Sequence, residues 1–202
     1  MSLALSSLLL LAAAETEIPV PVLVPPEEAV RRLEACGLVD VEAHYDDLVQ
    51  EDVLLVGDHA PANEILACAA DVSTTTGYWI EVPESSRAAY FAHYNTSSRE
   101  RSREWARARL AQQGLLETAP AYVAGETDDR VFAGRLEGLC GAAATGAFQS
   151  EYGPHTLSPA WILSWDMTTK GPGEVLACLM TYAAAAEYEL SFIGNEKAAA
   201  SD

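Results

Sequence analysis

Apolar side chains recur at helical spacing in four stretches of the chain. In the first stretch, Val30, Leu33 and Cys36 are three residues apart and therefore share one face of a helix. Pro26 suits the first turn of this helix and Gly37 suits its end. The other three predicted helices cover residues 61–76, 128–140 and 174–186.

Shorter runs of apolar and aromatic residues lie between these helices and predict strands. In the first half of the chain they cover 39–45, 52–56 and 78–82, and in the second half they cover 148–152, 161–165 and 188–193. Each half therefore has the order helix, strand, strand, helix, strand. This order predicts an α+β fold.

The two halves also resemble each other in sequence. NEILACAADVSTTTGYWIEV, at 63–82, has a cysteine followed ten positions later by a tyrosine, and so has GEVLACLMTYAAAAEYELSF, at 173–192. We therefore predict an internal duplication, with repeat unit 1 at 27–83, a helical connecting segment at 84–127 and repeat unit 2 at 128–197. The alternative is a chance resemblance, because few positions are identical.

The cysteines test this prediction, since four of them can pair in three ways. If each repeat unit has its own disulfide between its two helices, the pairs are Cys36–Cys68 and Cys140–Cys178. These bonds would close loops of 32 and 38 residues. The chain-entropy model gives a stabilisation of about 3.5–4 kcal/mol for each bond. The alternative is that all four cysteines are buried free thiols.

The N-terminal residues favour export. Residues 1–14, MSLALSSLLLLAAA, contain an uncharged, mainly apolar run that is too short to span a bilayer as a helix. Ala12 and Ala14 supply the small side chains of a cleavage site, so we expect a signal peptide and a periplasmic or secreted protein. No lysine or arginine precedes the run, which leaves a buried helix or a retained anchor as alternatives. A proline-rich spacer is expected at 15–26 and a disordered tail at 198–202.

Composition narrows the choice of partners. The chain has 30 acidic and 12 basic residues, which gives a net charge of −18. Such a charge repels phosphate groups, so nucleic acid is not expected as a partner. No apolar run of 18 residues follows the N-terminal segment, so no membrane span is expected in the mature chain.

One segment between the predicted repeat units is basic. Residues 85–113 have a net charge of +4 within this acidic chain. They could form a docking face for an acidic partner or an anionic ligand, or they could pair with the protein's own carboxylates, which is the interpretation we favour. The candidate interaction residues, here called the arginine arm, are Arg99, Arg101, Arg103, Trp105, Arg107 and Arg109.

The sequence contains no recognisable catalytic motif. Its four histidines lack the spacing of metal ligands, and neither a serine-hydrolase elbow nor a dinucleotide-binding loop is present. We therefore assign no catalytic residue and expect no metal or cofactor. Trp161 and Trp165 would lie on one face of the strand predicted at 161–165, where they could stack on a ligand such as a sugar ring or pack in the core.

These observations predict an exported, non-catalytic binding or interaction protein, whose partner is an unidentified protein or envelope component. The alternative is a small envelope hydrolase with its active site in a groove between the two repeat units. A histidine and a carboxylate in one deep pocket would favour the hydrolase. A shallow site bordered by arginine and tryptophan would favour binding.

Overall fold

The computed structural model describes residues 22–48, 50–165 and 171–191. Within these ranges the chain combines helices with a three-stranded sheet, so the α+β class is confirmed. The expected signal peptide, most of the proline-rich spacer and the expected disordered tail lie outside the described residues.

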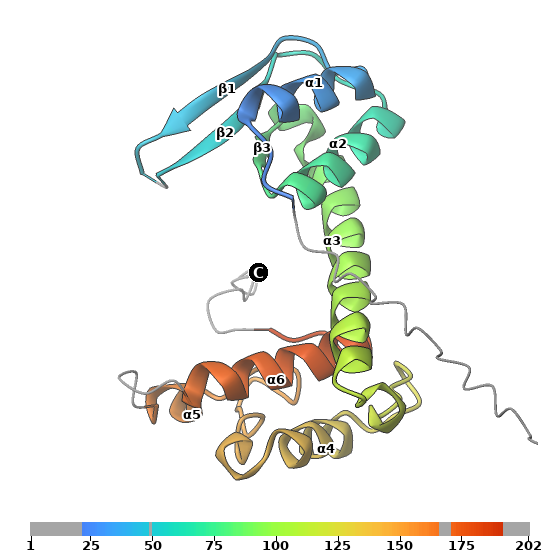
Figure 1. Ribbon diagram of the computed structural model, residues 1–202, viewed down its shortest axis with the longest axis vertical. Coiled ribbons are helices and arrows are strands. Elements are labelled where there is room, and N and C mark those ends of the chain that lie inside the picture. Colours follow the sequence, from blue (N-terminus) through green and yellow to red (C-terminus); the bar gives the residue numbers. More distant parts are fainter. Residues whose placement is uncertain (1–21, 49, 166–170, 192–202) are drawn as a thin grey trace, which may run out of the picture.

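The molecule has two lobes at the ends of one long helix, α3 (Glu84–Gln112), as Figure 1 shows. The N-terminal lobe contains α1, α2 and the sheet, and the C-terminal lobe contains α4, α5 and α6. Tyr90, near the start of α3, is buried in the first core. Ala106 and Leu110, near its end, are buried in the second core. The helix therefore belongs to both lobes.

The N-terminal lobe closely follows the predicted order of elements. These are α1 (Pro26–Cys36), β1 (Val41–Asp46), β2 (Glu51–Val56), α2 (Asn63–Thr76) and β3 (Trp79–Glu81). β1 and β2 form an antiparallel hairpin, and β3 lies parallel to β2. Helix α2 makes the crossover that a parallel pair requires. Buried side chains from the helices and the sheet form the core of this lobe.

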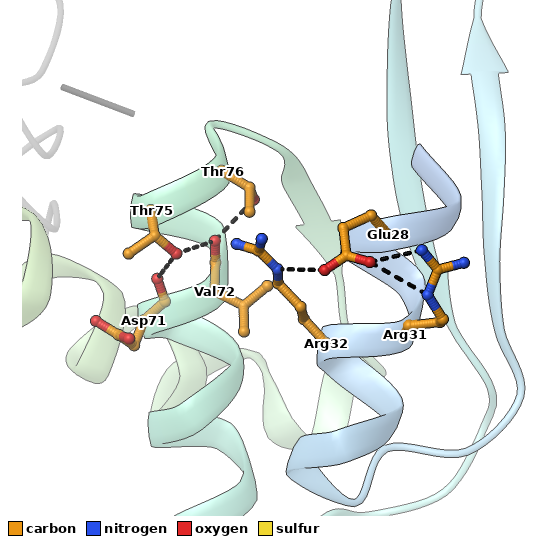
Figure 2. Close-up of polar contacts among 7 residues, drawn as sticks. All are labelled: Glu28, Arg31, Arg32, Asp71, Val72, Thr75 and Thr76. Atoms are coloured by element: carbon orange, nitrogen blue, oxygen red, sulfur yellow. Dashed lines mark hydrogen bonds and ion pairs between the residues drawn. The ribbon is translucent and has the colours of Figure 1, made fainter. Parts of the chain in front are cut away.

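Local signals explain the bounds of α1. Pro26 stands in the first turn, and Gly37 ends the helix with a left-handed φ of 100°. Polar contacts on α1 are local: Glu28 accepts hydrogen bonds from Arg31 and Arg32, which hold the pKa of its carboxyl below the ordinary value. Figure 2 shows these contacts beside those of α2, where Thr76 donates to the Val72 carbonyl. Neither set joins the two helices.

The C-terminal lobe is helical and differs from the prediction. Its elements are η1 (Leu116–Thr118), α4 (Asp129–Cys140), η2 (Ala142–Ala144), α5 (Pro159–Leu163) and α6 (Gly171–Ala185). Residues 148–152 form no strand, and at the described end of 188–193 there is a single bridge between Thr156 and Ser191. Both strand predictions are therefore wrong over the described residues.

The strand predicted at 161–165 is also wrong, because most of it belongs to helix α5. Ser158 caps this helix by accepting a hydrogen bond from the Trp161 amide, and Pro159 occupies the first turn. Both residues are strong signals for a helix start, and they outweigh the alternation of apolar residues that suggested a strand.

Each lobe contains a pair of helices joined by a disulfide. Cys36 in α1 is bonded to Cys68 in α2, and Cys140 in α4 is bonded to Cys178 in α6. These are the pairs expected from the sequence. The predicted duplication is not confirmed, since the second lobe lacks the sheet of the first over the described residues.

Candidate functional site

A groove of about 570 Å³ lies between α3 and α6. One wall is the middle of α3, where Thr96, Arg99 and Arg103 line the space. The floor is formed by Met180, Ala183 and Ala184 of α6, and the rim by the four residues that follow this helix, 187–190. The volume is typical of ligand pockets and suits a few side chains rather than a whole domain.

Helical periodicity explains why these side chains meet. Residues 96, 99 and 103 of α3 are three and four positions apart, and so are residues 180, 183 and 184 of α6, so each set lies on one face of its helix. Ala183 is buried in the core of the C-terminal lobe, and Ala184 is partly buried against that core. Met180 is 45% exposed and is the large apolar side chain of the floor.

Two ion pairs cross from α3 to the rim. Arg99 lies 2.9 Å from Glu189, and Arg103 lies 2.7 Å from Glu187. The hydrogen bond and charge of Glu187 raise the pKa of the Arg103 guanidinium. Both pairs are largely solvent-exposed, so each contributes little to stability. Their clearer effect is to hold the rim against α3.

The rest of the arginine arm does not form one face with this site. Arg101 points to the N-terminal lobe, where it donates to Asp71 at 2.8 Å and to Thr74 at 3.1 Å. Arg109 lies over the Trp105 ring at 5.3 Å, and Trp105 packs against the core of the C-terminal lobe. Arg107 is exposed and has no ion pair with another described residue. This geometry favours the interpretation that arm residues pair with the protein's own carboxylates.

The two candidate stacking residues lie in the C-terminal lobe, away from the groove lining. Trp161 is 8% exposed and donates from Nε1 to the Ala143 carbonyl at 3.0 Å. The Trp165 ring meets it edge-on, with 4.5 Å between the ring centroids. Both rings contact the core of the lobe. Their geometry is that of core packing.

A histidine–carboxylate pair occurs elsewhere in the C-terminal lobe. Nε2 of His155 is 3.1 Å from Oδ2 of Asp129, and Nδ1 donates to the Glu189 carbonyl at 3.0 Å. The His155 ring also stacks on Tyr188, with 4.4 Å between the centroids. Both ring nitrogens already face acceptors, so this histidine is positioned to hold the rim backbone rather than to take a proton from a substrate.

Sequence reasoning found the two rim-binding arginines but missed the rest of the groove. Glu187 is 84 positions from Arg103, and no local pattern connects the two. Helical spacing at 180, 183 and 184 was available as a signal, although it also fits an ordinary core helix.

The described residues carry neither a metal site nor a membrane span. They contain no group of three or more histidine, cysteine or acidic side chains placed to hold a metal ion. In the same part of the chain, no helix is long and apolar enough to cross a bilayer.

Comparison with known proteins identifies no relative. No family model matches the chain, and neither the curated proteins nor the solved structures contain a significant match.

Proposed function

We propose that this is an exported, non-catalytic binding protein and that the groove between α3 and α6 receives a segment of its partner. The observation that carries the proposal is the combination of an open apolar floor with a charged rim. Met180 is 45% exposed on that floor, although a side chain of its kind usually gains stability by burial. A partner that covers Met180 would supply that burial.

The alternative, a hydrolase, has less support from the groove. None of the described residues that line it is a histidine. The His155–Asp129 pair contributes no side chain to the lining, and both of its ring nitrogens are engaged. Of the arginine and tryptophan expected around a binding site, the groove has the arginines Arg99 and Arg103, while none of the described residues that line it is a tryptophan.

The disulfides support the exported location. Two of them join helix pairs in separate lobes, and such bonds form and persist in oxidising compartments. The partner is then a protein or another component of the envelope or the secreted space.

Selection of peptides tests the proposal while the partner itself is unidentified. Random twelve-residue peptides displayed on phage are selected on the oxidised protein and then assayed against two variants. Met180→Arg blocks the groove floor. Leu139→Arg is the matched control, because Leu139 is 42% exposed on α4 and does not line the groove.

We expect selected peptides to bind the wild-type protein and the Leu139→Arg variant but to lose binding to Met180→Arg. Peptides that bind all three proteins equally, or a selection that yields no binder, would overturn the groove as the binding site.

A further inference from the structure

Acidic residues outnumber basic residues in the lining of the groove. Its lining contains two arginines, Arg99 and Arg103, and three acidic residues, Glu100, Glu187 and Glu189. Each arginine already pairs with a rim glutamate. The lining therefore has one carboxylate more than it has guanidinium groups, and Glu100 is the one outside both ion pairs, although its charge also acts on the Arg103 guanidinium.

The carboxylates of the two rim glutamates can also accept further hydrogen bonds. The side chains of Glu187 and Glu189 are 65% and 69% exposed, and a carboxylate has about four lone-pair positions for donors. A second cation can therefore approach either carboxylate from the solvent side without displacing its arginine.

The groove also has apolar lining residues. Its accessible apolar surface comes from Met180 and Ala184 of α6 and from Leu190 of the rim, whereas Ala183 is buried. Methionine is flexible and polarisable and adapts to different apolar side chains. The partner segment must therefore present an apolar side chain next to its charged groups.

We infer that the partner segment is a short cationic amphipathic stretch, with an apolar side chain on Met180 and a lysine or arginine near Glu100. This inference rests on the proposed function. Attraction to a chain of net charge −18 would also increase the rate of association.

Other occupants fit less well. An acidic segment would have to displace Glu187 or Glu189 from its arginine and approach a strongly acidic protein. A second copy of this chain carries the same net charge of −18 and would be repelled.

Three synthetic peptides separate these possibilities. Each has twelve residues, blocked ends and leucine at the same four positions. The other eight positions are all lysine in the first peptide, all glutamine in the second and all glutamate in the third. Their affinities for the oxidised wild-type protein are measured by calorimetry at low and high salt. Glu100→Gln is compared with Glu104→Gln, a matched control one turn further along α3 that does not line the groove.

We expect the lysine peptide to bind most tightly and to weaken as salt increases. Glu100→Gln should weaken it about three- to fivefold, the scale of one exposed ion pair, and Glu104→Gln should have a much smaller effect. Met180→Arg should abolish binding and Leu139→Arg should not.

The outcomes distinguish the inference from the proposed function. If the glutamine or glutamate peptide binds best and still depends on Met180, the groove is a binding site and the inference is wrong. Equal losses of affinity for the lysine peptide in Glu100→Gln and Glu104→Gln would reveal general attraction to an acidic surface. That result would also overturn the inference. If no peptide depends on Met180, the proposed function itself fails.

Discussion

Asp129 shows how a single carboxylate organises the loops of the C-terminal lobe. It accepts a hydrogen bond from the Tyr122 hydroxyl at 2.8 Å and lies 3.1 Å from Nε2 of His155. The Tyr122 hydrogen bond, followed by that of His155, lowers the pKa of the Asp129 carboxyl below its ordinary value. His155 in turn holds the backbone of Glu189, a residue of the groove rim.

This arrangement predicts a pH-dependent contribution to stability. Because the pKa of Asp129 is lower in the folded state, its carboxylate stabilises the fold above the unfolded pKa, and this contribution is lost as pH falls through the folded pKa. Asp129→Asn should therefore be less stable than wild type at neutral pH, with a difference that shrinks below about pH 4. Urea unfolding at a series of pH values measures this difference.

Glu126→Gln provides the control, because Glu126 is an exposed acidic residue in the loop before α4. A constant difference between Asp129→Asn and wild type from neutral to acid pH would show that the carboxylate charge is not what matters at this position.

At the scale of elements, α3 connects the two lobes and also forms a wall of the groove. Arg101 pairs with Asp71 of α2, whereas Arg99 and Arg103 pair with the rim that follows α6. Arginines two positions apart along α3 thus contact different lobes. Three of the five arginines of the arginine arm therefore pair with carboxylates of the same chain.

Charge reversal on α3 tests this role. Arg103→Glu would place a negative charge beside Glu187, so it should lower the melting temperature and loosen the rim. Arg107→Glu is the control one turn away, at an exposed position without an ion pair to another described residue. Thermal unfolding followed by circular dichroism compares the two variants, and equal melting temperatures would contradict a structural role for the Arg103 pair.

How well the sequence predicted each element depended on where its signals lie. In the N-terminal lobe the signals are local: Pro26 and Gly37 bound α1, and Gly77 ends α2 in the left-handed conformation. The predicted and observed elements therefore agree there to within about two residues. In the C-terminal lobe, the helix-start signal of Ser158 and Pro159 was present in the sequence, but the strand was predicted from the spacing of the tryptophans without it.

The groove was beyond sequence reasoning for a different reason. It depends on how α3 crosses α6, and that crossing is set by packing in the C-terminal lobe, where Ala106 and Leu110 of α3 enter the core. Contacts such as Arg99 with Glu189 join residues far apart in the chain. Spacing along one helix predicts which side chains share a face but not what that face will meet.

At the scale of the whole molecule, the two lobes have separate cores. Among the described residues, the buried cluster of the N-terminal lobe shares no member with that of the C-terminal lobe. Each lobe also has its own disulfide. The lobes are therefore expected to respond separately to local destabilisation.

Removal of one disulfide tests this independence. A variant with Cys140→Ala and Cys178→Ala should destabilise the C-terminal lobe by about 4 kcal/mol, the chain-entropy value for a loop of this length. Hydrogen exchange should show reduced protection in α4 and α6, with α1 and α2 close to wild type. The reciprocal variant, Cys36→Ala with Cys68→Ala, should reverse the pattern. A uniform loss of protection in both lobes would show that α3 couples them into one cooperative unit.

The most direct test of the groove observes Met180 itself. The sequence has three methionines, so labelling with methyl-¹³C methionine gives a simple spectrum in which Met180→Leu assigns the Met180 resonance. Leu139→Met adds a reference methyl group on α4, outside the groove lining and at a position of similar exposure. The protein is titrated with the tightest-binding of the three synthetic peptides. We predict that the Met180 resonance shifts until the site saturates while the reference resonance stays in place. Binding detected by calorimetry with no change at Met180, or equal changes at both positions, would contradict the assignment of this groove as the binding site.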